Sequence, residues 1–277
     1  MKTRMNVSAD QGLRGLTASA IALSAVVLLG GILLSSLPAL AAPEQMDRHD
    51  VQSARVLFRE SKVYEIVFFT LAEGMEKRVF EEYLPQAAPF FDKYGVRTIG
   101  MFSVVESRSD DLQSKMVGIF EWPDYAAKEK LESDEAFQRV ATLRDGAFSF
   151  FKSGWFSTKE DRQVTFHSDK TYELAGATLH PTEEAKALIG KYFEVSEPIK
   201  RSYGGTYPEF LIEMHPTDAN GTSTYSNDMQ FIVQWDSVED NQKLFANEEF
   251  RTQAAPLMQE AIAKADFVFA KFIFNEG

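Results

Sequence analysis

The sequence predicts an α+β protein that contains two copies of one domain. Residues 63–95 recur as residues 171–204, and both segments open with a Tyr-Glu pair and close with a Tyr-Gly pair. Residues 116–122 recur as 229–235, each run ending in tryptophan. Strand-like and helix-like segments also follow one another in the same order in both copies. A repeat of roughly 110 residues has the size of a small domain and is too long for a solenoid unit.

The bulk composition is that of an ordinary globular protein. The chain has 277 residues, of which 44% are hydrophobic, and a formal net charge of -12. This length and composition suffice for one full core or two small ones. An acidic surface repels phosphate backbones, so we expect no nucleic-acid partner. The chain has no cysteine, which excludes disulfides, thiolate metal sites and cysteine nucleophiles.

The first 41 residues have the pattern of a secretory signal peptide. A weakly basic start precedes the apolar run 16–34, and residues 39–41, Ala-Leu-Ala, match the small-x-small site of signal peptidases. We therefore expect cleavage after Ala41, a periplasmic or secreted location, and no membrane attachment after cleavage. The alternative is a retained anchor, because the apolar run is nearly long enough to span a bilayer. Residues 42–61 are polar without a sustained period, which predicts a flexible lead-in.

The first copy, residues 62–157, begins with a strand. Residues 62–71 are rich in Val, Ile and Phe, which favours extended structure. In residues 75–95 the apolar positions recur at spacings of three and four, which predicts an amphipathic helix that Pro85 and Pro89 kink or divide. The remaining elements of this copy are strands at 96–106, 115–122 and 148–157, with a second helical segment between the last two.

A charged linker, residues 158–170, leads to the second copy, residues 171–277. The same plan predicts strands at 171–179, 206–215, 228–236 and 266–275, a helix at 181–202 and further helices up to about 263. The order β-α-β-β-α-β is the ferredoxin-like plan, in which both helices cover one face of an antiparallel sheet. The open face of each sheet is also rich in apolar side chains. We therefore expect two tandem ferredoxin-like domains that pair their sheets into an intramolecular α/β barrel.

The repeated features together resemble a known group of proteins. They are the Tyr-Glu of each first strand, the Thr-Leu before the following turn, the Tyr-Gly that closes each first helix, and the Trp with the helix after it. In residues 63–157 and 171–275 they resemble the NIPSNAP-type families and related domains of unknown function in the dimeric α/β barrel superfamily. The resemblance implies the ferredoxin-like pairing and, by analogy, a homodimer. It does not select an activity, because that superfamily contains cofactor-free monooxygenases, isomerases, haem enzymes and binding proteins.

The first candidate site is a pair of carboxylates on the first strands. Glu65 and Glu173 occupy equivalent positions, and each has a lysine, Lys152 or Lys271, at an equivalent position of the fourth strand. Strand alternation places Glu65 on a face with apolar neighbours. A carboxylate in an apolar layer has a raised pKa and can act as a general base. The alternative is a cross-strand Glu–Lys ion pair that the duplication places twice.

Two histidines lie at strand ends of the second copy. His180 follows the first strand and His215 ends the second. Such a histidine can move protons or bind a metal or haem iron, and His180 is therefore a candidate catalytic residue. The four histidines of the chain show no ligand spacing, so surface positions are the alternative. We expect no metal site and no cofactor.

Aromatic residues crowd the first and fourth strands of both copies. Core packing accounts for such residues in any sheet, whereas an aromatic-lined cavity would hold a flat or apolar ligand. A barrel of this size can enclose one small ligand. Trp122 and Trp235, at the ends of the third strands, are assigned to packing. The candidate ligand-binding residues are Tyr64, Tyr172, Phe69, Phe150, Phe269, Lys152 and Lys271.

Three functions follow from these features. The first is an exported protein that binds a small hydrophobic or aromatic molecule in the barrel interior. The second is a cofactor-independent monooxygenase or isomerase of a small aromatic or carbonyl compound. It would use Glu65 or Glu173 together with Tyr64, Tyr172 or His180. The third is a structural or protein-interaction module with a filled barrel. Sequence alone does not decide among them.

Overall fold

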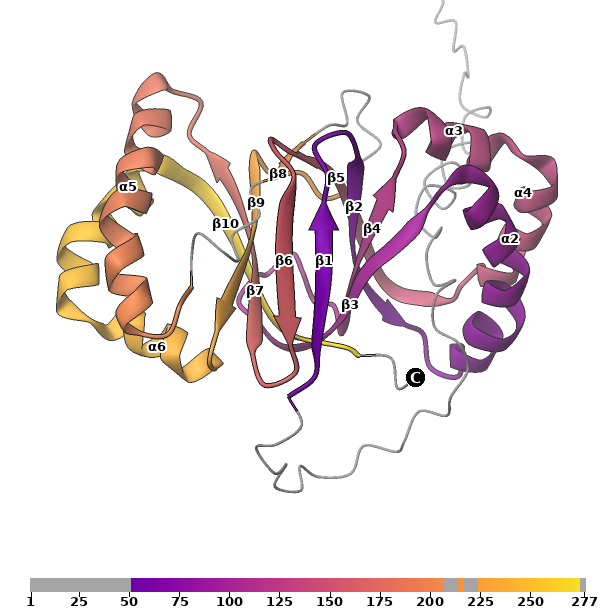
Figure 1. The fold of residues 1–277 in the computed structure, drawn as a ribbon, viewed down its shortest axis with the longest axis horizontal. Helices are drawn as coiled ribbons and strands as arrows, with labels where there is room; N and C mark the ends of the chain where they lie inside the picture. The colour runs from indigo at the N-terminus through magenta and orange to yellow at the C-terminus, as the bar shows by residue number, and fades with distance from the viewer. Residues whose placement is uncertain (1–50, 207–213, 217–223, 275–277) are drawn as a thin grey trace, which may run out of the picture.

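The computed structural model describes residues 51–206, 214–216 and 224–274 (Figure 1). The expected signal peptide and most of the second copy's second strand and following turn lie outside these residues. In the part that is described, no helix is long and apolar enough to cross a membrane. The strands are β1 (Ser53–Phe58), β2 (Val63–Leu71), β3 (Arg97–Ser107), β4 (Met116–Trp122), β5 (Phe148–Thr158), β6 (Arg162–His167), β7 (Thr171–Leu179), β8 (Met214–Pro216), β9 (Met229–Trp235) and β10 (Ile262–Phe272). The helices are α2 (Leu84–Tyr94), α3 (Tyr125–Ser133), α4 (Glu135–Ala141), α5 (Glu183–Ser202), α6 (Val238–Ala246) and α7 (Ala255–Ala261), with short helical turns η1 (Arg78–Tyr83), η2 (Thr142–Arg144) and η3 (Phe250–Ala254).

Eight strands form a closed antiparallel barrel in the middle of the molecule. Their order around the barrel is β10-β3-β4-β2-β5-β8-β9-β7. We call residues 53–158 the first half and residues 162–272 the second half. Strand β10 pairs with β7 of its own half and with β3 of the first half, and β5 likewise pairs with β2 and with β8. The expected α+β class with antiparallel strands is confirmed.

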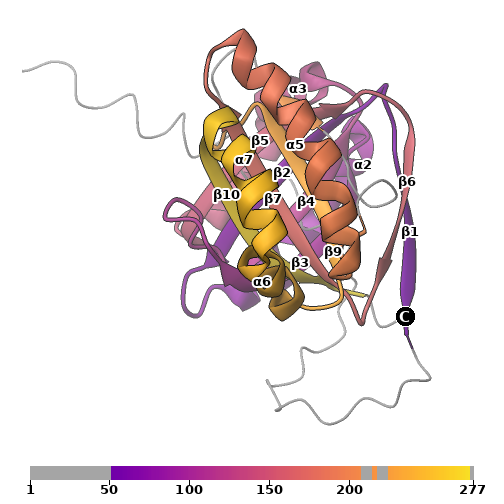
Figure 2. The same ribbon diagram turned by 90° about the vertical axis from the view of Figure 1, so that its left-hand side faces the viewer.

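The helices lie in two groups on opposite sides of the barrel (Figures 1 and 2). Helices α2, α3 and α4 cover the first half, and α5, α6 and α7 cover the second. Gly95, at a φ of 72°, ends α2 in the left-handed conformation that its place after Tyr94 predicts. Pro85 lies in the first turn of α2, where a missing amide hydrogen costs little, and the π-helical turn η1 precedes it. The predicted interruption therefore falls before Pro85, and Pro89 lies inside α2 without dividing it.

Side-chain alternation divides the apolar residues into three clusters. On β2, Ile66 and Phe68 face the barrel interior, whereas Val67 and Phe69 face the helices of the first half. A third cluster lies between the sheet and the helices of the second half. Glu65 shares the parity of Val67 and Phe69, so the expected face is confirmed. The interior cluster includes Phe58, Tyr64, Ile66, Phe68, Phe102, Val117, Ile119, Phe156, Phe166, Tyr172, Leu174, Tyr225, Ile232 and Val268.

Side chains fill the barrel interior. The ring of Phe102 lies 5.4 Å from that of Phe166 and 6.0 Å from that of Tyr172, measured between centroids. Tyr225 enters the barrel beside two strand glycines, and a Cβ at Gly154 or Gly176 would overlap Tyr225 atoms. The interior thus uses glycine to admit one more aromatic side chain. The sequence left open whether the aromatic side chains of the barrel interior pack together or line a cavity. In the structure they pack together.

The segments expected to be a flexible lead-in (42–61) and a charged linker (158–170) each contain a strand. Strands β1 and β6 pair antiparallel, from Ser53 opposite His167 to Phe58 opposite Arg162. This two-stranded ribbon lies over the barrel (Figure 2). Its inner residues Phe58 and Phe166 are fully buried against the interior cluster, while its outer residues are polar except for the exposed Leu57. The expectation was wrong for these residues because alternate apolar positions bury one face of an otherwise polar segment.

Candidate functional site

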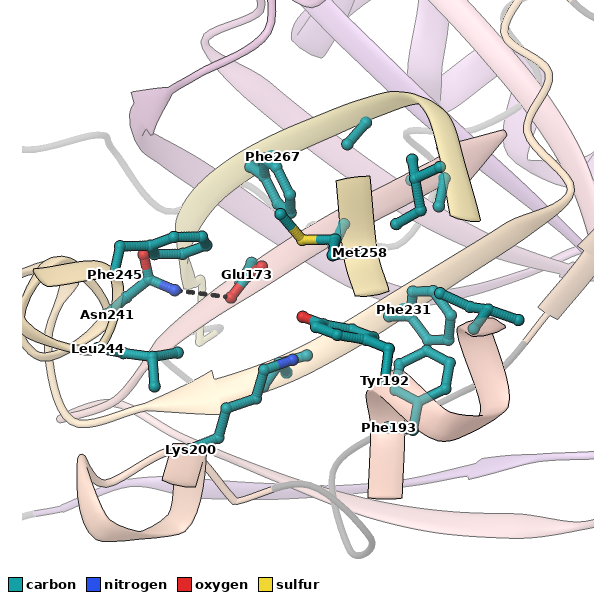
Figure 3. Close-up of a pocket in the computed structure, with 17 residues that line it drawn as sticks. Glu173, Tyr192, Phe193, Lys200, Phe231, Asn241, Leu244, Phe245, Met258 and Phe267 are labelled. Carbon is teal, nitrogen blue, oxygen red and sulfur yellow. Dashed lines mark hydrogen bonds between the residues drawn. The ribbon is translucent and has the colours of Figure 1, made fainter. Parts of the chain in front are cut away.

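A cavity of about 30 Å³ lies between the sheet and the helices of the second half (Figure 3). It is separate from the barrel interior. The sheet supplies its floor from β7, β9 and β10, and α5, α6 and α7 close it from outside. Its lining residues are Glu173, Ala175, Gly176, Ala177, Ile189, Tyr192, Phe193, Lys200, Phe231, Val233, Asn241, Leu244, Phe245, Met258, Ile262, Ala265 and Phe267.

Glu173 is the acidic group of this cavity, and only 6% of its surface is exposed. Its Oε2 accepts a hydrogen bond of 2.6 Å from Nε1 of Trp235 and one of 3.1 Å from Nδ2 of Asn241. Both bonds converge on Oε2, and Oε1 accepts neither. Burial raises the pKa of Glu173, and the positive charge of Lys200, the Trp235 hydrogen bond and the charge of Arg108 oppose the shift. The carboxyl group is therefore held in place while its proton affinity is increased.

The local sequence explains how these partners meet. Trp235 is the last residue of β9, and Ser237 caps α6 by accepting a hydrogen bond of 3.2 Å from the amide of Asp240. One helical turn later, Asn241 is placed above the strand that carries Glu173. The spacing from Trp235 to Asn241 is six residues, enough for a turn and the start of a helix.

Two further polar side chains come from α5. Tyr192 and Lys200 are eight residues apart, so they lie on one face of the helix. Both are directed into the cavity in Figure 3. The Lys200 ammonium lies 5.0 Å from the centroid of the Tyr192 ring, within the range of a cation–π contact. Lys200 is 7% exposed, so its charge acts on Glu173 through protein rather than water.

Aromatic and aliphatic side chains form the remaining walls. The rings of Phe193 and Phe231 have centroids 5.3 Å apart, and those of Phe245 and Phe267 have centroids 6.5 Å apart. Met258 of α7 lies among them (Figure 3). A mainly apolar wall with a few converging polar groups is the usual composition of a small-molecule site.

The first half has an equivalent carboxylate in a different setting. Glu65 is fully buried, and neither carboxylate oxygen accepts a hydrogen bond from the residues that the structure describes. Lys128 stands at the position of Asn241, six residues after Trp122. Its ammonium lies 3.2 Å from Glu132 Oε2, so it forms an ion pair there rather than a hydrogen bond to Glu65. Burial, together with the charge of Glu132, raises the pKa of Glu65 to about 8, against the lowering effects of Lys128 and of the Ser153 and Trp122 side chains.

The expected Glu–Lys ion pairs are not formed. Glu65 lies opposite Trp155, whereas Lys152 lies opposite Phe68 on the other face, with its ammonium 4.0 Å from Asp111. In the second half, Phe269 lies opposite Glu173. Lys271 is two residues further along β10, and burial lowers its pKa. The cations with the largest effect on the pKa of the two carboxylates, Lys128 and Lys200, instead come from helices, which strand register alone does not predict.

Tyr64 and Tyr172, expected to contact a ligand, face the barrel interior, and their hydroxyl groups are bonded to backbone. The hydroxyl of Tyr64 accepts from the amide of Arg59 at 2.5 Å, and that of Tyr172 accepts from the amide of His167 at 2.6 Å. Each bond ties the end of a ribbon strand to the first barrel strand of the same half. These tyrosines therefore hold the ribbon on the barrel.

The other predicted residues are dispersed. Phe69 and Phe269 pack in the two sheet–helix clusters, and Phe150 packs at the edge of the interior cluster. His180 is exposed just after β7, and the side chain of His215 lies outside the described part. In that part, no three His, Asp or Glu side chains are grouped to hold a metal ion. Of all the predicted site residues, Glu173 alone lines the cavity.

Sequence reasoning missed Tyr192, Lys200, Asn241 and Arg108, and assigned Trp235 to packing. The sequence did contain a signal for Asn241, because a polar residue stands six positions after the repeated tryptophan in both copies. Trp235 does pack, but its indole nitrogen also bonds Glu173. The other residues come from distant parts of the chain.

No protein-family model and no curated protein sequence matches this chain. Its structure is similar to that of an anthrone oxidase-like protein, with a TM-score of 0.55 and 11% identity over 79% of this chain and 94% of that one. It also matches chlorite dismutase from Candidatus Nitrospira defluvii, with a TM-score of 0.45 and 10% identity over 78% and 93%. A dimeric ferredoxin-like protein of unknown function from Bacteroides fragilis NCTC 9343 matches with a TM-score of 0.30 and 12% identity, over 38% of this chain and 97% of that one. At 11% identity, the similarity to the anthrone oxidase-like protein supports the α+β fold and says nothing about activity.

Proposed function

We propose that the chain is a cofactor-independent isomerase or monooxygenase that takes a proton from a small carbonyl or phenolic compound. The observation that carries this proposal is the setting of Glu173. Its carboxylate is buried beside a cavity, is oriented by Trp235 and Asn241, and has a raised pKa. A general base works best when its pKa is near the working pH and its position is fixed.

The remaining polar groups suit the charge that such a reaction develops. Proton removal beside a carbonyl leaves an enolate, and removal from a phenol leaves a phenolate. The positive charge of Lys200 lies in the same cavity and can stabilise either anion in an apolar setting. In an isomerase, Glu173 returns the proton to another atom of the substrate. In an oxygenase, a CH2 group and O2 become a carbonyl group and water. The name of the anthrone oxidase-like neighbour is in line with this second version.

The size of the cavity sets a condition on substrate binding. About 30 Å³ accommodates two water-sized molecules, whereas drug-sized ligands occupy roughly 300–1,000 Å³. Substrate must therefore enlarge the site by moving α5–α7 outward or by changing side-chain rotamers. Met258 is the most adaptable wall residue, because its unbranched side chain has three rotatable bonds.

The test is proton exchange with a matched pair of variants. Anthrone and 2-indanone are incubated in D2O with the wild type, Glu173→Gln or Glu65→Gln, and deuterium uptake and oxygen consumption are measured. A positioned general base contributes about 10² to 10⁴-fold, so we expect a loss of this size in Glu173→Gln and little change in Glu65→Gln. Equal rates in the wild type and Glu173→Gln, with both folded, would show that Glu173 is not the base.

A second candidate is a structural or interaction module, and the filled barrel interior favours it. The packed rings around Phe102 and Tyr225 also weigh against a hydrophobic ligand in that interior. A binding protein that uses the second-half cavity instead would retain its ligand in Glu173→Gln. Native mass spectrometry of the purified wild type and variant separates these cases, because a module carries no bound mass and a binding protein carries one in both.

We further propose that the protein is exported, with cleavage after Ala41, and that its halves are two ferredoxin-like domains, 62–157 and 171–277. The Ala-Leu-Ala site supports the first statement. The strand order and the cross-half pairing of β10 and β5 support the second. A NIPSNAP-type relationship and a homodimer stay proposals of the same kind. N-terminal sequencing of the mature protein and light scattering measure cleavage and oligomeric state.

A further inference from the structure

Arg108 belongs to the first half of the chain and contacts Asn241, a lining residue of the second-half cavity. It follows β3 directly, and its backbone amide donates a hydrogen bond of 2.8 Å to the carbonyl of Phe267 on β10. Its guanidinium carbon lies 4.5 Å from the centroid of the Phe269 ring. The side chain is 28% exposed, and its Nε lies 2.5 Å from Oε1 of Glu106. Backbone, ring and carboxylate together fix the direction of the guanidinium group.

This fixed guanidinium group bonds the residue that bonds Glu173. Nη1 of Arg108 donates to Oδ1 of Asn241 at 2.8 Å, and Nδ2 of Asn241 donates to Oε2 of Glu173 at 3.1 Å. A guanidinium group has donors and no acceptor, so it can bond only the oxygen of the amide. With its oxygen held by Arg108, the amide must turn its nitrogen to the carboxylate. The opposite orientation would place an amide oxygen against the carboxylate and N–H groups against the guanidinium.

We propose that Arg108 is a positioning residue for Glu173, acting through the amide of Asn241. The part of this inference that concerns catalysis rests on the proposed function of the cavity, whereas the hydrogen-bond relay does not. The site of the second half is then incomplete without the first half. The first half contrasts with it, because Lys128 at the position of Asn241 pairs with Glu132 and no amide orients Glu65.

The relay can be followed by NMR without a substrate. The chain has three tryptophans, so three indole N–H signals are expected, and the one lost in Trp235→Phe reports on the bond to Glu173. The side-chain amide signals lost in Asn241→Ser report on Asn241. In Arg108→Met we expect the Asn241 amide protons to exchange at least about tenfold faster and the Trp235 indole signal to move, since one anchoring hydrogen bond is gone. Arg108→Lys, which keeps one donor, should restore part of the protection.

Arg201→Met is the matched control, because this exposed arginine pairs with Glu197 within α5. It should leave the Trp235 and Asn241 signals unchanged. Unchanged signals in folded Arg108→Met would overturn the proposal. If that variant does not fold, Arg108→Lys takes its place, and signals and exchange rates equal to those of the wild type would overturn the proposal, because only part of the protection should be restored. If the signals change but the wild type exchanges no proton of anthrone or 2-indanone, the relay stands and the proposed function fails.

If the wild type is active, Arg108→Met should lower kcat about tenfold with a smaller change in KM, as expected for a lost orienting contact.

Discussion

At the scale of single residues, the burial of Glu65 makes stability depend on pH. Burial raises its folded-state pKa from 4.5 to about 8, so the folded state binds this proton more tightly than the unfolded chain does. The stabilisation from this group is complete below the pKa that Glu65 has in the unfolded chain. It is lost as the pH rises through the pKa that Glu65 has in the folded state. Between these values the loss is about 1.4 kcal/mol per pH unit, an order-of-magnitude slope.

Glu65→Gln should remove this dependence, because an amide does not titrate. We expect the free energy of unfolding of the variant to gain on that of the wild type as pH rises from about 5 to 8. Urea unfolding curves at several pH values measure the difference. Parallel pH profiles for the two proteins would mean that folding does not raise the pKa of Glu65. Its carboxylate would then be charged between pH 5 and 8, with Lys128 compensating the charge.

The same scale shows what sequence can say about a site. Repetition and strand parity singled out Glu173 and placed it correctly on an apolar face. They missed Lys200, Asn241 and Arg108, which come from α5, α6 and the first half. No periodic pattern links residues that far apart, since only tertiary packing brings them to one carboxylate. The predicted lysine partners failed for the related reason that strand register, not residue spacing, decides which side chains are neighbours.

At the scale of elements, the β1–β6 ribbon should contribute strongly to stability. Phe166 is fully buried, with ring contacts to Phe102, Tyr172 and Phe272. Phe166→Ala leaves a cavity at this point and should cost about 3–5 kcal/mol. Gln163→Ala, at an exposed position of the same strand, is the control and should change the free energy of unfolding by less than about 0.5 kcal/mol. Similar values for the two variants in chemical denaturation would show that the ribbon is a loosely attached cover.

The ribbon also shows why element prediction failed where it did. Strands β2, β4, β7 and β9, of seven to nine residues, have strong propensity, and the sequence predicts their ends within about two residues. The ribbon strands have six residues each, with charges between their apolar positions, so composition favours a linker. A signal was present nonetheless, because the spacing Val-x-Phe before Lys-x-Tyr-Glu occurs at 56–65 and again at 164–173. The repeat therefore begins earlier than the first barrel strand.

At the scale of the whole molecule, the sequence could predict that two apolar sheet faces meet but not what lies between them. Whether a barrel is hollow depends on a few volumes, here the ring of Tyr225 and the missing side chains of Gly154 and Gly176. These residues are far apart in the chain, and their fit exists only after closure. A filled interior leaves the layers between sheet and helices as places for chemistry. The two layers have diverged. One holds a carboxylate bonded by an amide beside a cavity, and the other holds an ion-paired lysine near a carboxylate that no amide orients.

Closure of the barrel also predicts that the halves unfold together. Strand β10 pairs with β7 over residues 262–270 and with β3 over residues 268–272, and β5 pairs with β2 and β8. Neither sheet can therefore be lost without exposing the other. The indole signals of Trp122 and Trp155 report on the first half, and that of Trp235 on the second. In a urea titration followed by NMR, all three should disappear at the same midpoint. Earlier loss of the Trp235 signal would show that the second half opens by itself, and then Arg108, although anchored in the first half, could no longer keep Glu173 in place.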